Sequence, residues 1–275
     1  MKRKQLIERT YLVIKAEIIK QQKHEFHSAF VWLSLLVWPI LGFFEVYYAY
    51  KPFELTGYLG FLSNRDLLAF LGTGFMAYTC FWSMVQSAWA MSNKERTDGT
   101  LEITFLSSAN RLAMNYGRAL GSLIQEVWMF CCFCVFVLLY SEAVSLSNLW
   151  VLPLCLLLLL ISSTVWGGML NAVFLFSRDA EIVMNLIDTP MTLFSGSRIP
   201  IHCFPVWAKA IAFLFPLTYC NNIIRFALDI QREENGWLRE SLYLAVCLAT
   251  MIVITKWITF RAETHNRMTG ELQFY

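Results

Sequence analysis

Apolar runs of membrane-spanning length are the feature that most constrains how this chain can fold. A helix needs about 20 apolar residues to cross the ~30 Å hydrocarbon core of a bilayer. Hydrophobic residues make up 57% of the chain and charged residues only 15%, against about a quarter charged in soluble domains. The sequence therefore predicts an all-α polytopic membrane protein with six transmembrane helices, at residues 30–50, 67–91, 120–140, 149–176, 182–196 and 242–260.

The fifth of these runs is short for a span, and the apolar stretch that follows it, residues 204–227, is interrupted by Pro205 and Pro216. Lipid tolerates broken backbone only where protein or a wet cavity covers it. We therefore expect an outer re-entrant hairpin between spans five and six. The alternative is a seventh span, which would put the C-terminal tail on the other side of the membrane from the N-terminus.

The distribution of basic residues predicts the orientation. With the N-terminus inside, fifteen of the 22 Lys and Arg residues fall in cytoplasmic segments, and the positive-inside rule then places both termini in the cytoplasm. We expect a multi-pass protein of the cytoplasmic (inner) membrane, with one transmembrane domain over residues 1–275. A net charge of +2 without a basic stripe argues against nucleic acid as a partner. The domain divides into a cytoplasmic amphipathic helix, a six-span core and a cytoplasmic tail, at residues 1–26, 27–260 and 261–275.

The N-terminal segment has one apolar helical face. Ile7, Tyr11, Ile14 and Ile18 recur at helical spacing. Such a helix lies along the inner interface, with its basic residues near anionic head groups of membrane lipids. A helix that docks on a partner protein has the same pattern, and the two interpretations are compatible.

Residues 92–118 form the longest polar stretch between two spans on the cytoplasmic side. A turn is expected at Asp98-Gly99, a short helix over residues 100–105, and a second break that ends at Asn110, a residue suited to cap a helix. Connecting two spans needs only a few residues. A structured helix here therefore indicates a docking partner. The alternative, a helix that lies on the lipid surface, is disfavoured by the nearby acidic residues Glu95, Asp98 and Glu102.

Two motifs of this sequence resemble those of the type-2 ABC exporter permeases. The first resembles the coupling-helix region of that family and consists of Glu95-Arg96, Gly99-Thr100-Leu101-Glu102, Leu106-Ser107-Ser108 and Arg111. The second resembles the fifth helix, the outer re-entrant hairpin and the return toward helix six. It consists of Phe194-Ser195-Gly196, Pro200, Phe204-Pro205, Trp207, Pro216-Leu217-Thr218-Tyr219 and Arg225. The Gly-Thr-Leu-Glu tetrapeptide is closest to the drug- and small-lipid-exporting members.

The resemblance implies a permease with two six-helix subunits, as a homodimer or heterodimer, and two cytosolic ABC ATPase subunits. The cargo would be an amphipathic drug, peptide or lipid-like molecule. Residues implied in ATPase coupling are Glu95, Arg96, Gly99, Thr100, Leu101, Glu102, Phe105 and Arg111. Residues implied in the outer hairpin are Gly196, Pro200, Pro205, Pro216 and Arg225.

The chain itself lacks the G-x-x-x-x-G-K-[ST] loop that cradles nucleotide phosphates. We therefore expect a transport subunit without enzyme activity and without a bound cofactor, with ATP and Mg on the partner ATPase. Three alternatives stay open: a lipid-linked glycan exporter permease, an intramembrane lipid-modifying enzyme and a non-transporting immunity subunit. The enzyme needs paired catalytic groups, and we find no convincing set. His202-Cys203 has no second ligand pair at the spacing of a metal site.

Several side chains at membrane depth are candidates for the transport pathway. Charges there are costly, so Glu126 and Asp188 are either polar points or latches between helices, or acids near an interface or paired within the chain. The pathway candidates are Trp38, Phe75, Tyr78 and Asp188, although aromatic residues also form ordinary interfacial belts.

Cysteines inside the predicted spans are interpreted as packing residues. Cys203 and Cys220 both fall in the hairpin instead. They could form a disulfide if their Cα atoms come within about 7 Å.

Overall fold

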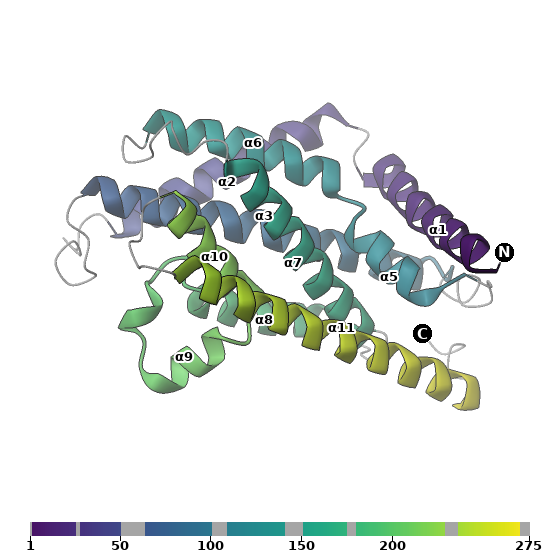
Figure 1. Cartoon of the computed structure of the whole chain (residues 1–275). Helices are drawn as coiled ribbons and strands as arrows, with labels where there is room; N and C mark the ends of the chain where they lie inside the picture. The colour runs from purple at the N-terminus through teal and green to yellow at the C-terminus, as the bar shows by residue number, and fades with distance from the viewer. Residues whose placement is uncertain are drawn as a thin grey trace.

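The computed structural model describes residues 2–25, 28–50, 64–100, 109–140, 151–174, 180–228 and 236–269. Every regular element within these ranges is a helix (Figure 1). In chain order they are α1 (Lys2–Glu25), α2 (Ala29–Tyr50), α3 (Asn64–Thr97), α5 (Arg111–Ala119), α6 (Leu123–Tyr140), α7 (Leu152–Phe174), α8 (Ala180–Phe194), the 3-10 turn η3 (Ile201–Cys203), α9 (Val206–Ala212), α10 (Pro216–Ala227) and α11 (Gly236–Thr269).

Four helices in the described part of the chain are long and apolar enough to cross a membrane: α2, α3, α7 and α11. The pair α9 and α10, bent by 91°, raises this number to five if the pair is one span. Outside this count, α6 has 18 residues and α8 has 15. Length and composition of the described helices therefore give four or five spans, fewer than the six that the sequence predicts.

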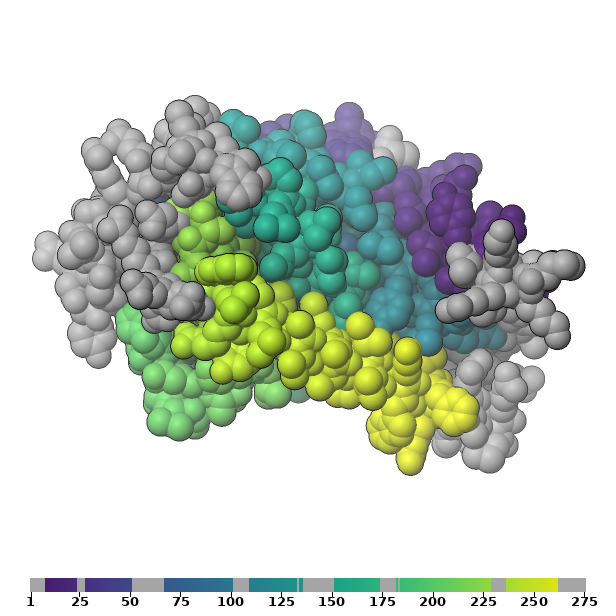
Figure 2. Space-filling model, in the orientation of Figure 1, coloured from purple at the N-terminus to yellow at the C-terminus, as the bar shows by residue number. Residues whose placement is uncertain are grey.

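The helix α3 is the centre of the molecule. It contacts α2, α5, α6, α7, α8 and α10, and its buried residues include Phe81, Leu71 and Met84. Around it, α7 packs on α5, α10 and α11, and Figure 2 shows α11, in yellow, on the surface of the molecule. The start of α1 and the end of α11 lie at one end of the molecule, called here the α1 end, and α9 lies at the opposite α9 end (Figure 1).

Helix boundaries depart from the apolar runs mainly at polar ends. The helix α3 continues six residues past the predicted end at Met91, to Thr97. The third predicted span begins at Leu123, after a separate helix, α5. The last helix runs from Gly236 to Thr269 and not only over 242–260. A helix continues into a polar sequence wherever its side chains find water or partners, so hydropathy alone marks only its apolar middle.

The helix α1 packs on α5 through a polar face. Glu17 and Gln21 are buried, whereas Tyr11 of the predicted apolar face is 61% exposed. A Cβ added to Gly117 would lie 3.1 Å from the Cβ of Glu17, and one on Gly121 would overlap the side chain of Gln21. Two glycines four residues apart thus let the two backbones approach closely.

At the α9 end, α3 approaches the loop that follows α8 at Gly74. A Cβ there would lie 2.2 Å from the carbonyl oxygen of Ser197 and 2.5 Å from Nη2 of Arg225. The same loop turns at Gly196, whose φ of +76° is in the left-handed region that favours glycine. These two glycines seat the loop and α10 directly against the central helix.

We predict that Gly74→Ala lowers the stability of the purified protein by about 1–3 kcal/mol, because the new methyl group overpacks against a backbone carbonyl. Gly167→Ala is the matched control, since its Cβ would lie 3.6 Å from the nearest atom, an ordinary contact. Thermal unfolding in detergent compares the two variants. Equal melting temperatures for G74A and G167A would contradict the close approach at Gly74.

Candidate functional site

The end of α3 at the α1 end is a Schellman cap. Gly99 has φ of +68°; its N–H donates to the carbonyl oxygen of Arg96 at 3.2 Å, and the N–H of Thr100 donates to that of Glu95 at 3.0 Å. This pair of bonds around a left-handed glycine closes a helix. The turn predicted at Asp98-Gly99 is thereby confirmed.

The carboxylate of Glu95 lies inside the protein. Glu95 is 3% exposed, and it accepts hydrogen bonds from Lys20 of α1 and from Arg118 of α5. Arg118 is buried as well. One acidic side chain therefore ties the capped end of α3 to two other helices.

The same cluster continues into α7. Arg118 Nη1 donates to Ser92 Oγ at 3.0 Å, and Ser92 Oγ donates to Asn171 Oδ1 at 2.6 Å. Asn171 Nδ2 in turn donates to Asn115 Oδ1 at 2.7 Å. We call these five residues, Glu95, Arg118, Ser92, Asn171 and Asn115, the polar cluster; it joins α3, α5 and α7.

Glu17 is a second acid beside the polar cluster. Its Oε2 lies 3.8 Å from Lys20 Nζ and 3.9 Å from Arg118 Nε. Burial raises the pKa of Glu17 above its usual value, and the two cations offset only part of this effect. Because its folded pKa is raised, the contribution of Glu17 to stability is largest below its unfolded pKa and falls as the pH rises through its folded pKa.

The residues implied in ATPase coupling separate into a surface set and an internal residue. Gly99 and Thr100 are exposed, Arg96 and Arg111 are half-buried, and Glu95 is buried. Asn110 caps α5 by accepting a hydrogen bond from the N–H of Leu112 at 3.0 Å, as predicted. The last three, Leu101, Glu102 and Phe105, lie outside the described residues.

Of the pathway candidates, Tyr78 and Asp188 come together. Tyr78 Oη donates to Asp188 Oδ1 at 2.6 Å and joins α3 to α8. Phe75 packs edge-on against Phe43 of α2, with ring centroids 6.4 Å apart. Trp38 is 74% exposed and has no such contact with the other three.

Glu126 differs from Asp188 because it is 1% exposed and neither of its carboxylate oxygens has a hydrogen-bond partner among the described residues. The sequence left open whether this acid is a polar point of the pathway, a latch between helices, an acid near an interface or an acid paired within the chain. The structure places it in the interior, at the first turn of α6.

The two prolines of the hairpin begin helices. Pro205 is the N-cap of α9 and Pro216 the first residue of α10, positions where the missing N–H costs nothing. Pro200 precedes η3 in the same way. Cys203 and Cys220 are free thiols, and Cys220 Sγ contacts Ser162 Oγ at 3.3 Å, so the structure has no disulfide between them.

Arg225 is buried against α3. It is 1% exposed, its guanidinium lies 3.5 Å from the ring centroid of Phe70, and Nη2 donates to the carbonyl oxygens of Phe70 and Ser197 at 3.3 and 3.4 Å. Asn221, one turn earlier, donates to the carbonyl oxygen of Ser195 at 3.0 Å. Arg225 therefore holds the loop after α8 and does not reach a lipid surface.

The family model of the ABC-2 type transporter matches residues 9–228, most of the chain. The chain belongs to this family. It is thus a multi-pass membrane protein and a permease subunit of an ABC transporter. No curated protein matches it.

All five residues of the polar cluster lie within the region that the ABC-2 family model matches. The sequence interpretation did not predict this cluster. The available signals were Gly117 and Gly121 at four-residue spacing, with Arg118 between them next to an apolar run. A basic residue beside a small-residue helix contact indicates a buried partner acid, but its identity needs the fold. The groups of three or more His, Cys, Asp or Glu that could hold a metal ion are absent from the residues described here.

We predict that Glu95→Gln destabilises the protein by about 3–5 kcal/mol, because it removes the close anion of buried Arg118 and leaves only Glu17, whose Oε2 is 3.9 Å from Arg118 Nε. Asp98→Asn is the control on an exposed acid of the same turn, and surface changes of this kind stay within about 0.5 kcal/mol. Chemical or thermal unfolding of the purified chain measures both.

A double variant tests whether the effect comes from the ion pair. Replacing a buried pair by apolar residues is often nearly neutral, so Glu95→Leu with Arg118→Met is expected to be more stable than Glu95→Gln alone. An unfolding midpoint of E95Q equal to that of D98N would contradict the role of this pair.

Proposed function

We propose that this ABC-2 permease is the membrane-spanning subunit of an ATP-driven exporter of an amphipathic substrate, a drug, a peptide or a lipid-like molecule. Two permease subunits form the pathway across the cytoplasmic membrane, and two ATPase subunits in separate chains bind ATP and Mg. Family membership supports the permease role. The finer assignment rests on the geometry at the end of α3.

The observation that carries the proposal is the connection between the cap of α3 and the polar cluster. The loop after α3 starts at Thr100, whose N–H is bonded to the carbonyl oxygen of Glu95. The carboxylate of the same Glu95 binds α1 and α5. A push on the loop by an ATPase therefore reaches three helices through one residue, which a loop that only connects two spans does not require.

In this mechanism Glu95 is a positioning residue and not a contact to the ATPase. The surface contact falls to Gly99, Thr100, Arg96 and Arg111, together with the segment 100–105 for which the sequence predicts a helix. Displacing Glu95 by a few ångströms separates buried charges, which is costly at low dielectric. The cluster consequently favours movement of α1, α3 and α5 as one unit.

We infer a six-span topology with both termini in the cytoplasm. The spans are α2, α3, α6, α7, α8 and α11, and η3, α9 and α10 form an outer re-entrant hairpin. Two observations support this: α1 and the end of α11 share one end of the molecule while α9 lies at the other (Figure 1), and α10, with 12 residues, is only about 18 Å long.

The pathway proposal places Tyr78 and Asp188 beside an apolar route. Their hydrogen bond offers a polar point between α3 and α8, and Phe75 adds an aromatic wall. Trp38 belongs to a stripe of exposed apolar residues on α2; a second permease subunit would cover this stripe and bring Trp38 to the pathway. The stripe consists of Phe30, Leu33, Val37, Trp38 and Leu41.

The coupling assignment predicts that a cysteine at Thr100 crosslinks to the ATPase in the assembled complex. The background variant replaces Cys131 and Cys203, the first exposed and the second half-buried. Val206→Cys, 85% exposed at the α9 end, is the control and is expected not to crosslink. A complex that hydrolyses ATP but gives no crosslink at position 100 would sink the coupling assignment.

The topology predicts opposite labelling of the same two cysteines in intact cells. A membrane-impermeant thiol reagent should modify V206C at once and T100C only after the membrane is permeabilised. Labelling of T100C in sealed cells, or protection of V206C, contradicts a cytoplasmic α1 end. Comparable labelling of both in permeabilised cells controls for burial.

A further inference from the structure

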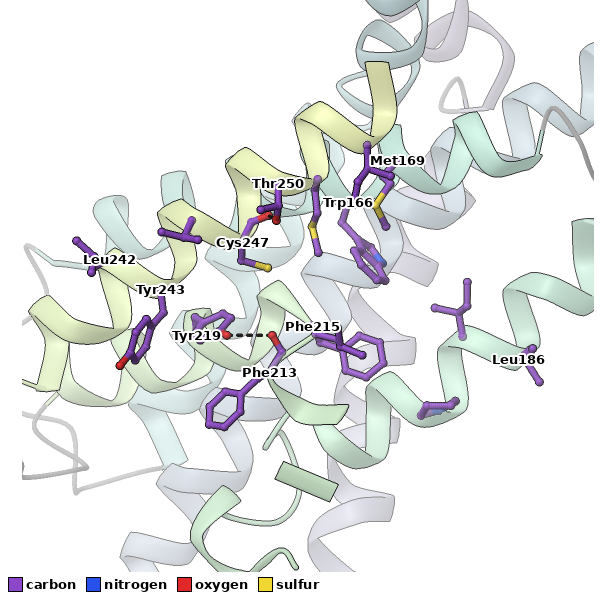
Figure 3. A pocket seen from close by; sticks show the side chains of 16 residues that line it. Trp166, Met169, Leu186, Phe213, Phe215, Tyr219, Leu242, Tyr243, Cys247 and Thr250 are labelled. Carbon is purple, nitrogen blue, oxygen red and sulfur yellow. Dashed lines mark hydrogen bonds between the residues drawn. The ribbon is translucent and has the colours of Figure 1, made fainter. Parts of the chain in front are cut away.

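An apolar groove of about 740 Å³ opens between α7, α8, α10 and α11. Figure 3 shows side chains from these four helices and from the connection between α9 and α10 around one space, with Tyr219, Phe213 and Tyr243 toward one end and Trp166 and Met169 toward the other. The residues of α11 that line it run from Leu242 to Ile254. This is a different place from Tyr78 and Asp188, which do not line it.

The groove offers water almost nothing to bind. The hydroxyl of Tyr219 donates to the carbonyl oxygen of Phe213 at 2.9 Å, and that of Thr250 to Cys247 at 2.7 Å. The indole Nε1 of Trp166 has no partner among the described residues, but this atom is itself buried, and apolar cavities with so few accessible polar groups stay dry. At the same time Leu186 is 70%, Leu242 64% and Val246 58% exposed. In a multi-pass membrane protein such an open apolar face meets hydrocarbon.

The length of the groove fits one lipid tail. From Leu242 to Ile254 a helix advances about 18 Å, close to half of the ~30 Å hydrocarbon core. A hydrocarbon chain lying along α11 would therefore extend through one leaflet, with its far end near Met251 and Ile254.

Two basic residues lie one helical turn in sequence from one end of the groove. Phe213, Tyr219 and Tyr243 form that end, with ring centroids 6.2 and 6.3 Å apart. Arg239 lies one helical turn before Tyr243, and Lys209 one turn before Phe213, positions on the same helix faces. Arg239 is 56% exposed and 3.7 Å from Glu240. Glu240 pairs with Arg239 and offsets one of these two charges, so a net positive charge lies about one helical turn from the aromatic end of the groove and complements the head group of an anionic lipid.

We propose that the groove is a site for an anionic phospholipid of the surrounding bilayer. Its phosphate lies at Arg239 and Lys209, and one acyl chain fills the space between α8 and α11. The lipid is thus part of the packing of the helices around α10, separate from the cargo of the transporter.

The experiment uses the full-length chain in vesicles of phosphatidylglycerol and phosphatidylcholine that contain a trace of phosphatidylglycerol with a photoactivatable diazirine in its acyl chain. Illumination followed by mass spectrometry of peptides maps the adducts. We expect them on α8 and α11 at the lining residues Leu186, Ile187, Val246 and Thr250. Adducts spread evenly over all exposed apolar residues would overturn the site.

Filling the groove tests occupancy. Val246→Trp should reduce labelling of the lining residues several-fold, whereas Val253→Trp should not, because Val253 is equally exposed on the same helix but does not line the groove. Leu242→Trp is a second filling variant, in case V246W folds poorly. Undiminished labelling in both filling variants overturns the proposal.

Two further variants separate the occupants. Arg239→Gln with Lys209→Gln should remove the preference for the anionic probe over a diazirine phosphatidylcholine, and an unchanged preference overturns the head-group position. Trp166→Phe should leave labelling unchanged, since a hydrocarbon tail makes no hydrogen bond. The indole Nε1 of Trp166 has no partner among the described residues. If W166F abolishes labelling by the lipid probe, a polar part of the lipid and not its acyl chain contacts Trp166, and the position of the acyl chain in the groove is wrong.

A second copy of the chain is the remaining occupant. Val246→Cys in a background without exposed cysteines would then form a disulfide between two copies in the membrane. Crosslinked dimer through position 246 would overturn the lipid site, and its absence together with acyl-chain adducts supports the site.

Discussion

The buried pair of Glu95 and Arg118 is the interaction on which one end of the molecule depends. Removing two charges from water costs several kcal/mol per ion, and only close geometry with further hydrogen bonds offsets this. Arg118 has such bonds, to Glu95 and to Ser92. Any arrangement that separated α3 from α5 would leave both charges in a poorly solvated place. The position of α5 against α3 is therefore fixed, because separating the two helices would leave both charges unpaired. The helix α1 is held to the same place by the hydrogen bond from Lys20 to Glu95.

The central helix α3 is held at both ends by side chains from other helices. At the α1 end its anchor is Glu95, and at the α9 end its backbone carbonyl at Phe70 receives the guanidinium of Arg225. Between them it packs through close-fitting apolar residues such as Phe81 and Met84. Protein interiors of this density transmit strain with little compression. A displacement of α3 at the α1 end is therefore transmitted along the helix to its α9 end. There α3 contacts the loop after α8 through Gly74 and Arg225.

The sequence predicted the features that local chemistry determines. Apolar length located the middle of each long helix, Asp98-Gly99 predicted the cap, and Asn110 predicted the start of α5. The prolines at 205 and 216 were recognised as breaks, and the structure shows that they begin helices. These features depend on a few neighbouring residues, so one sequence is enough to find them.

Features that depend on residues distant in sequence could not be found in this way. Glu95 has the same local surroundings as the exposed Asp98, and only the approach of Arg118 and Lys20 buries it. The helix α1 buries Glu17 and Gln21, leaves Ile14 and Ile18 half-buried and exposes Tyr11, because Gly117 and Gly121 admit the polar residues that flank its apolar face. The groove beside α11 likewise arises from the space between four helices. The sequence of any one of these helices does not predict it.

The two most deeply buried charged groups at the centre of the chain show how position decides what a charge can do. Arg225 has two carbonyl acceptors for Nη2 and an aromatic ring beside its guanidinium, so part of the cost of its burial is offset locally although its Nε has no partner among the described residues, and it holds the loop after α8. Glu126 is as deeply buried, but its carboxylate oxygens have no hydrogen-bond partner in the described part of the structure. Burying a carboxyl group without hydrogen bonds is costly, whereas Asp188 has the hydroxyl of Tyr78 as a donor. Asp188 therefore joins α3 to α8 through a made hydrogen bond, and Glu126, at the first turn of α6, is held in place by packing alone among the residues that the structure describes.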